Sequence, residues 1–329
     1  MLFQTLAENK LSLANRIVMP PMATHLSPEG CVTEELCTHY AARASAGTGL
    51  IITEHCCIAQ SGRADPHQLS VAEDSLLPGL TRLSSCVHAS GPSKIFVQIN
   101  HAGSQTQSSV TGCELMSASA LPHPALTNAE KPRPLTQKEI ADLVSQFALA
   151  AKRVRAAGFD GVEIHAAHGY LLNQFYSPLT NQRTDSYGSA SLENRLRFLL
   201  ETLDAVQAAV GADFPVAVRL GGSDYMPGGS TIADSVAAAQ MLEEAGADIL
   251  DISGGMCRYT RPEHKEAGWF SDMSQAIKKV VSIPVILTGG IKTRAQAEEL
   301  LSKGAADMIG IGRAMLKDAA WSQKARTEV

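Results

Sequence analysis

The feature of this sequence that most constrains its fold is a recurring junction between a helical segment and a buried strand. In each case a Gly ends the helix and an Asp follows two or three residues later, at Ala157–Asp160, Ala245–Asp248 and Lys303–Asp307. Eight short runs rich in Val, Ile and Leu are spaced along the chain: Arg16–Met19, Gly49–His55, Ile95–Ile99, Gly161–His165, Pro215–Leu220, Asp248–Ser253, Pro284–Thr288 and Asp307–Gly312. Apolar runs without polar alternation are typical of parallel strands that are covered on both faces.

Eight such strands with helices between them predict one (β/α)8 TIM barrel, of class α/β, over residues 1–329. The alternative is an open, doubly wound sheet, which needs a Gly-rich first turn. Here the first strand is followed by Pro20-Pro21-Met22, which does not fit that turn.

The helix boundaries carry their own signals. Thr136 and Glu139 form a capping-box pattern, and the helix that they begin is expected to end before Gly158. Further helices are expected over Ser191–Val210, Thr231–Ala245 and Thr293–Lys303, each followed by Gly. The long irregular stretches Gly103–Pro134 and Gly254–Phe270 are expected to be functional or mobile loops, and the first resembles a surface lid.

The composition excludes several classes of protein. The chain has a formal net charge of -5 and no basic stripe, so we expect no nucleic-acid partner. Its seven Cys include no CxxC pair, which argues against a disulfide framework, a zinc site or an iron–sulfur cluster. No apolar run is long enough to span a membrane, and the first residues do not resemble a signal peptide. We therefore expect a cytoplasmic protein without a membrane partner.

The fourth strand ends in a group of residues suited to catalysis. His165, His168 and Tyr170 follow each other where this strand gives way to a loop, which is where barrel enzymes place their active sites. Two neutral imidazoles can each donate an N–H to one substrate oxygen, and a nearby phenol can deliver a proton. The alternatives are half of a metal site, a pair of core histidines with satisfied hydrogen bonds, and a Tyr that only packs on the rings.

The ends of the last two strands predict a phosphate site. Gly289-Gly290 and Gly312 expose backbone N–H groups, and Arg313 adds a bidentate cation. Gln98 and Arg219 line the same mouth and suit the polar edge and the negative charge of a flavin, so FMN is the predicted ligand. The alternatives are a plain tight turn with a surface cation, a satisfied core amide at Gln98, and a buried ion pair of Arg219 with Glu163 or Asp251.

Several motifs of this chain resemble the old yellow enzyme family, the FMN-dependent ene-reductases or NADH:flavin oxidoreductases. They are NRIVMPPM (15–22), VQINHAG (97–103), HAAHGY (165–170), SPLTNQRTDSYG (177–188), ENR (193–195) and GIGR (310–313), which cover the chain in the family's order. Paired His in the fourth-strand motif resembles the bacterial, single-domain branch.

The resemblance implies a role for each matching residue. Those implied to contact FMN are Pro20, Pro21, Met22, Ala23, His55, Gln98, Arg219, Gly289, Gly290, Gly312 and Arg313. His165 and His168 are implied to bind the substrate's oxygen, and Tyr170 to be the proton donor. The implied reaction is ping-pong: NADH or NADPH reduces FMN, and flavin N5 then passes hydride to the activated C=C bond of an α,β-unsaturated carbonyl or carboxylate compound.

The chain also departs from the family pattern. Ala23 stands where some bacterial relatives have Cys, so we expect no thiol effect on the flavin potential. His25 stands near where those relatives have Tyr, and we expect it to contact substrate instead. His55 is bulky for a position beside a flavin. Arg258, Tyr259, Arg261 and His264 form a basic loop. This loop either binds an acidic substrate tail or a CoA-like phosphate, with His264 as a substrate contact, or is a solvated face.

Two other functions remain open at this stage. One is an FMN amine dehydrogenase or demethylase, and the other is a flavin subunit that only passes electrons to a partner protein. The chain ends soon after its last strand, so we expect electrons to come directly from a nicotinamide or from another protein. A homo-oligomer is a further expectation.

Overall fold

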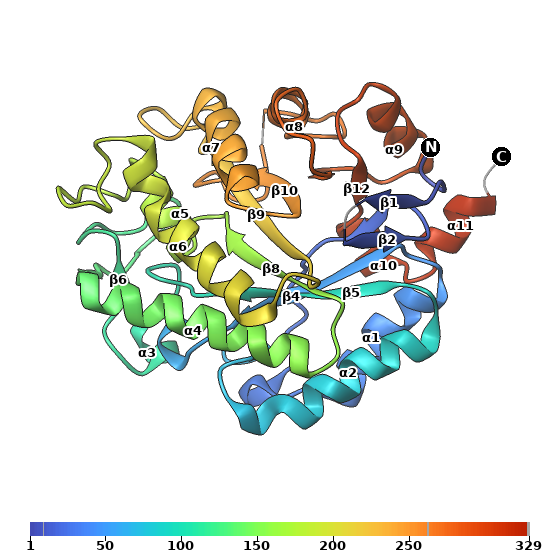
Figure 1. Ribbon diagram of the computed structural model, residues 1–329, viewed down its shortest axis with the longest axis horizontal. Helices are drawn as coiled ribbons and strands as arrows, with labels where there is room; N and C mark the ends of the chain where they lie inside the picture. Colours follow the sequence, from blue (N-terminus) through green and yellow to red (C-terminus); the bar gives the residue numbers. More distant parts are fainter. Residues whose placement is uncertain (9, 262, 328–329) are drawn as a thin grey trace.

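The computed structural model describes residues 1–8, 10–261 and 263–327, and its centre is a closed parallel barrel (Figure 1). The barrel strands follow each other in chain order: β3 (Ile17–Met19), β4 (Leu50–Cys57), β5 (Lys94–Asn100), β8 (Gly161–Ala166), β9 (Val216–Ser223), β10 (Ile249–Gly254), β11 (Val285–Thr288) and β12 (Met308–Gly310). β12 pairs with β3 and closes the ring. The predicted TIM barrel is confirmed.

Each of the eight predicted apolar runs forms one of these strands, with boundaries that shift by up to three residues. The largest extension is at β9, which continues through Gly221 and Gly222 to Ser223. A Cβ on Gly221 would lie 2.8 Å from the Ala167 Cα and from the Gly254 carbonyl oxygen. Glycine is therefore required where the segments that follow β8 and β10 approach β9.

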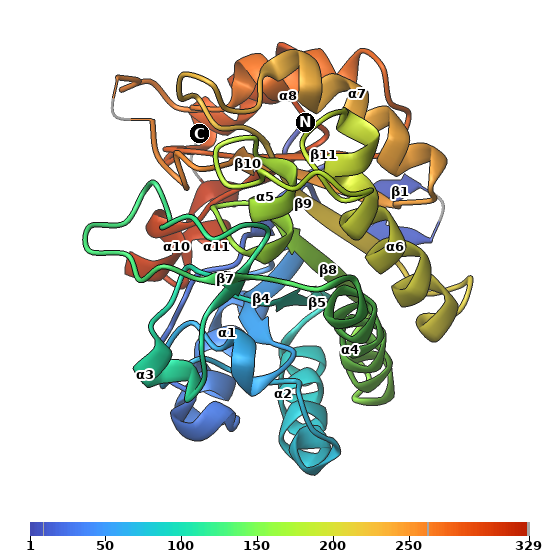
Figure 2. The ribbon, with the colours of Figure 1, turned by 90° about the vertical axis from the view of Figure 1, so that its left-hand side faces the viewer.

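Helices surround the barrel on its outside (Figure 2). They are α1 (Glu34–Ser45), α2 (Leu77–Ser90), α4 (Gln137–Ala156), α5 (Leu171–Tyr176), α6 (Leu192–Val210), α7 (Ile232–Glu244), α8 (Ser271–Lys278), α9 (Arg294–Ser302), α10 (Arg313–Lys317) and α11 (Trp321–Thr327). The capping box predicted at Thr136 and Glu139 is present and begins α4. Thr231 and Thr293 begin α7 and α9 with the same motif.

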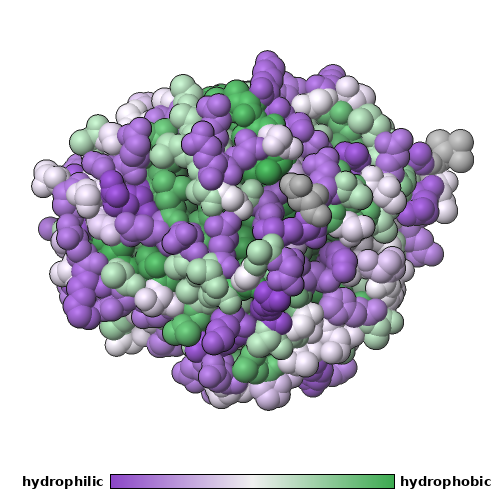
Figure 3. Space-filling view, viewed as in Figure 1, coloured by the Kyte–Doolittle hydropathy of each residue, from purple (hydrophilic) through white to green (hydrophobic). Residues whose placement is uncertain are grey.

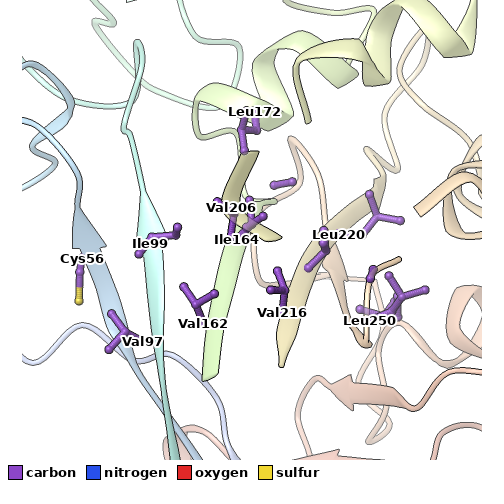
Figure 4. Packing of buried hydrophobic residues seen from close by; sticks show 14 of the residues in the cluster. Cys56, Val97, Ile99, Val162, Ile164, Leu172, Val206, Val216, Leu220 and Leu250 are labelled. Atoms are coloured by element: carbon purple, nitrogen blue, oxygen red, sulfur yellow. The ribbon is translucent and has the colours of Figure 1, made fainter. Parts of the chain in front are cut away.

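The core lies between the strands and the helices that cover them. In Figure 4, Val162 and Ile164 of β8 lie beside Val216 and Leu220 of β9, and Val206 of α6 is close by. These side chains are fully buried. Their apolar area is what holds the helical layer on the barrel, at roughly 25 cal/mol for each Å² removed from water.

A short N-terminal hairpin, which the sequence analysis did not predict, covers one end of the barrel. β1 (Leu6–Glu8) pairs antiparallel with β2 (Leu11–Leu13). Their buried leucines form a separate cluster with side chains near the beginnings of the barrel strands: Val18, Leu50, Ile52, Phe96, Ala217, Ile249, Ile286 and Met308. The amino-terminal end of the barrel is thus filled, and the opposite end is left for a site.

The first long loop, Gly103–Pro134, contains the short elements α3 (Ser108–Thr111), β6 (Met116–Ser117) and β7 (Arg133–Pro134). It is tied to the barrel because the Ser117 hydroxyl donates to Gln174 Oε1 over 2.8 Å. In the second, Gly254–Phe270, residue 262 lies outside the described residues.

The face in Figure 3 is largely hydrophilic, with smaller hydrophobic areas between the polar side chains. Within the described residues, no helix combines the length and the apolar character that crossing a membrane requires. Cytoplasmic location and assembly into a homo-oligomer stay predictions.

Candidate active site

A cavity of about 950 Å³ opens at the carboxyl ends of the barrel strands, opposite the N-terminal hairpin. All but one of the predicted site residues line it: Pro20, Pro21, Met22, Ala23, His25, His55, Gln98, His165, His168, Tyr170, Arg219, Gly289, Gly290, Gly312 and Arg313. His264 does not. It lies on an exposed part of the second long loop, with its Nε2 4.0 Å from Glu263 Oε1.

The two predicted substrate-binding histidines lie together on one wall. His165, at the end of β8, is 2% exposed, and its ring centroid is 5.0 Å from those of both His168 and Tyr170. His165 Nδ1 is buried and has no hydrogen-bond partner among the described residues. His168 Nε2 lies 2.7 Å from the Ser253 hydroxyl at the end of β10.

His168 is held in a left-handed backbone conformation, with φ of 61°. Its backbone N–H donates to the Gly254 carbonyl over 3.0 Å, which fixes the bend. A non-Gly residue in this region is strained, and such strain gathers at functional sites. Here it turns the imidazole back toward His165.

Both histidines are neutral at ordinary pH. Burial lowers the pKa of each well below its usual range, and the positive charge of Arg219 and the neighbouring imidazoles lower it further. A neutral imidazole has one N–H donor and one acceptor nitrogen. The pair can therefore offer two N–H groups to an oxygen without carrying a charge that would have to be buried.

Tyr170 places a phenol on this wall, next to the two histidines. Burial is the main cause that raises its pKa to about 12, so the phenol is protonated at neutral pH. Its hydroxyl oxygen lies 3.4 Å from His55 Nε2, and the two ring centroids are 5.1 Å apart.

Gln98 and Arg219 are each paired with a buried carboxylate, and for Arg219 this is the ion pair with Asp251 that the alternative interpretation named. Gln98 Nε2 donates to Glu163 Oε1 over 2.8 Å. Arg219 Nε lies 3.1 Å from Asp251 Oδ2 in a fully buried ion pair. Both residues still line the cavity, and Gln98 Oε1 and Glu163 Oε2 have no partner among the described residues. Gln98 therefore keeps an unused polar atom at the cavity although its Nε2 is paired.

The predicted phosphate end is built around a residue that sequence analysis missed, Trp269. Gly289 and Gly290 have φ of 139° and 67°, and a Cβ on Gly290 would lie 2.7 Å from the Trp269 ring. The guanidinium of Arg313 stacks on this ring, 4.7 Å from its centroid. Within the described part of the chain Arg313 has no acidic partner, so its charge is available to an anion.

Glu54 is a second missed residue. Its carboxylate accepts hydrogen bonds from the Thr24 backbone N–H at 2.7 Å and from the Thr24 hydroxyl at 3.0 Å. This anchors the segment Pro20–Ala23 along the cavity wall. A lone buried Glu at the end of an apolar strand was the available signal, but its partner could be found only in three dimensions.

No group of three or more His, Cys, Asp or Glu side chains in the described residues could hold a metal ion. His165 and His168 have other neighbours instead, namely Ser253, Tyr170 and His55. The chemistry that this cavity offers is oxygen binding by neutral N–H groups, proton donation by a phenol, and an anion site at its far end.

The model of the NADH:flavin oxidoreductase / NADH oxidase family matches residues 1–329. The chain belongs to this family. It is 42% identical over 323 residues to the NADH oxidase of Thermoanaerobacter brockii, covering 96% of this chain and 49% of that protein. It is 38% identical over 330 residues to the NADPH dehydrogenase of Geobacillus thermodenitrificans, covering 100% and 94%.

Solved structures of the family have the same fold. The old yellow enzyme homologue of Zymomonas mobilis has a TM-score of 0.85 at 30% identity, over 97% of this chain and 90% of that one. A 2-naphthoyl-CoA reductase has a TM-score of 0.93 at 26% identity, over 99% and 52%. The chain spans about half the length of this reductase and of the relatives named NADH oxidase and metal reductase.

FMN is the cofactor of this family, and the cavity fits it. The unpaired Gln98 Oε1 suits a polar ring edge, and Arg219 suits a negative charge on that ring. At the other end, glycine backbone and the unpaired Arg313 suit a phosphate. The volume of about 950 Å³ lies at the upper end of ordinary cofactor sites.

Proposed function

We propose that this chain reduces the activated C=C bond of an α,β-unsaturated carbonyl or carboxylate compound, with FMN as cofactor and NADH or NADPH as electron donor. The observation that carries the proposal is the convergence of His165, His168 and Tyr170 on one cavity, two imidazoles neutral and the phenol protonated.

The residues proposed to hold FMN divide into three groups. Pro20, Pro21, Met22, Ala23 and His55 would contact the ring system from one wall. Gln98 and Arg219 would bind its polar edge, and Gly289, Gly290, Gly312 and Arg313 would bind the phosphate. Bound FMN supplies reversible two-electron redox chemistry at this place.

His165 and His168 bind the substrate's carbonyl, carboxylate or nitro oxygen through their N–H groups. As the C=C bond is reduced, negative charge develops on this oxygen. Hydrogen bonds to a charged acceptor are stronger than those to a neutral one, so the two donors stabilise the transition state more than the ground state. Because the site is buried, this preference is not screened by water.

Tyr170 completes the reduction. The carbon next to the substrate's carbonyl carries the electron pair of an enolate, and this pair forms the new C–H bond with the phenolic proton. The electrons of the broken O–H bond stay on the Tyr170 oxygen, which regains a proton from water. His25, which also lines the cavity, is proposed as a further substrate contact.

Steady-state turnover separates this function from its rivals. Purified protein with FMN is assayed with cyclohexenone and NADPH, with a secondary amine and an artificial electron acceptor in the absence of NADPH, and with NADPH and oxygen alone. The proposal requires that enone reduction be fastest and that His165→Ala/His168→Ala abolish it while FMN stays bound. Amine oxidation without enone reduction would support an amine dehydrogenase. Turnover only with an added electron-accepting protein would support a flavin subunit that passes electrons to a partner.

A further inference from the structure

The bulky side chain of His55 is the main departure of this cavity from the family pattern. The contacts around its ring determine which of the two ring nitrogens carries the hydrogen. His55 lies near the end of β4, opposite Gln98 of β5 in the strand register, and lines the cavity. Three polar groups face its ring: Gln68 Nε2 is 2.7 Å and Asn100 Nδ2 is 3.4 Å from Nδ1, and the Tyr170 hydroxyl is 3.4 Å from Nε2.

The orientation of the Gln68 amide is settled by backbone groups. Its Oε1 accepts from the Ala64 backbone N–H over 2.8 Å, and its Nε2 donates to the His55 backbone carbonyl over 2.9 Å. Rotating the amide by half a turn would break both bonds. The group that faces His55 Nδ1 is therefore an N–H, and Gln68 is buried, with 4% of its surface exposed.

An N–H that faces Nδ1 requires this nitrogen to be the acceptor. A neutral imidazole with Nδ1 as acceptor carries its hydrogen on Nε2. Burial lowers the pKa of His55 to about 4, with further lowering by the neighbouring His25 and Arg219, so the ring is neutral near pH 7. The Nε2–H then points at the Tyr170 oxygen.

We infer that His55 is a positioning residue for Tyr170: held by Gln68 as the Nε2–H tautomer, it donates to the phenol oxygen. The phenol's own hydrogen is thereby turned away from His55 and toward the cavity. This inference rests on the proposed function, in which Tyr170 is the proton donor.

The hydrogen bond from His55 Nε2–H to the Tyr170 oxygen also contributes during proton transfer. When the phenol proton leaves, its bonding electrons stay on the Tyr170 oxygen, and the acceptor of the His55 hydrogen bond becomes an anion. A distance of 3.4 Å is long for a bond between neutral groups. A charged acceptor shortens and strengthens it, so the bond contributes mainly in the transition state. A hydrogen bond to a charged group corresponds to roughly 10- to 100-fold in rate.

The tautomer is tested on the protein alone. Protein labelled with 15N in its histidine rings gives long-range 1H–15N spectra that show which nitrogen carries the hydrogen, and the spectrum of the variant H55Q identifies the signals of His55 by their loss. We expect Nε2–H with unprotonated Nδ1 at pH 7. A hydrogen on Nδ1, or on both nitrogens, would overturn the inference and leave the proposed function standing.

The kinetic test compares two substitutions of nearly equal size. In H55N the amide occupies the place of Nδ1 and cannot reach Tyr170, whereas in H55Q the longer side chain can place an N–H where Nε2 was. We expect H55N to lower kcat for enone reduction by roughly 10- to 100-fold with little change in KM and a larger solvent isotope effect. H55Q should recover part of that loss.

Equal losses of kcat in H55N and H55Q, or a rise in KM with unchanged kcat, would show that His55 acts in packing or binding. Either result would refute the inference. Absence of enone reduction in the unsubstituted protein would refute the proposed function, and the tautomer measurement would still decide the state of His55.

Discussion

Arg219 and Asp251 form a buried ion pair whose disruption should destabilise the protein measurably. Arg219 is 3% exposed and Asp251 is fully buried, with Arg219 Nε 3.1 Å from Asp251 Oδ2. Neither Asp251 oxygen has a partner with hydrogen-bond geometry among the described residues. The ion pair is thus the main contact that offsets the burial of this carboxylate.

The substitution Arg219→Met keeps most of the side chain's volume and removes its charge. Leaving one member of a buried ion pair without its partner costs about 3–5 kcal/mol of unfolding free energy. For a chain of this length, each kcal/mol corresponds to about 1.5 °C in Tm, so we expect Tm to fall by about 4–7 °C. The double variant R219M/D251L removes both charges and should recover most of this loss.

The loss of stability in R219M should also depend on pH. Burial raises the pKa of Asp251 to about 6, although Arg219 lowers it, and removing Arg219 raises it further. A carboxyl group whose folded-state pKa is raised contributes stability below its unfolded pKa and loses it as pH rises through the folded value. The penalty of R219M should therefore be smaller at pH 5 than at pH 8.

Differential scanning calorimetry of flavin-free protein measures these differences without the contribution of FMN binding. An R219M variant as stable as the unsubstituted protein at pH 8 would refute the reasoning. So would a double variant that is no more stable than R219M, because the cost would then come from lost packing and not from the unpaired carboxylate.

Three further predictions concern the cavity and its scaffold. Tyr170→Phe should slow enone reduction by roughly 10²- to 10⁴-fold while phenol ligands still bind, and unchanged turnover would exclude this proton donor. Arg313→Met should weaken FMN binding by roughly 10- to 100-fold in a fluorescence titration of the flavin-free protein, because a charge-assisted bond to the phosphate is lost; unaltered affinity would contradict the phosphate site. Thr136→Ala removes the capping box of α4 and should cost about 1 kcal/mol of stability with FMN affinity unchanged, which also makes it a control for R313M; a Tm shift of zero would show that the cap does not contribute.

Much of the barrel could be predicted because its signals are local. Runs of Val, Ile and Leu mark strands covered on both faces, and Thr136 and Glu139 mark the beginning of a helix within four residues of sequence. The N-terminal hairpin was missed because β1 and β2 have three residues each, too few for a period of two to be recognised.

The site residues that the sequence could indicate lie at strand ends, such as His165 and Gln98. Those that it could not indicate act through partners that are distant in the chain. Gln68 matters only because its amide meets His55 Nδ1, and Trp269 only because its ring covers Gly290. The alternatives left open for Gln98 and Arg219 could also be decided only from the structure. Both residues are paired with buried carboxylates and still line the cavity.

His165 and His168 are proposed to bind a ligand's oxygen in a flavin-containing cavity. A titration of the purified protein with p-hydroxybenzaldehyde, followed by visible absorbance, tests it most directly. We expect a flavin spectrum that develops a long-wavelength charge-transfer band, and the loss of this band in H165A/H168A with the flavin retained. A flavin spectrum without the band, or a band that is unchanged in the double variant, would contradict it.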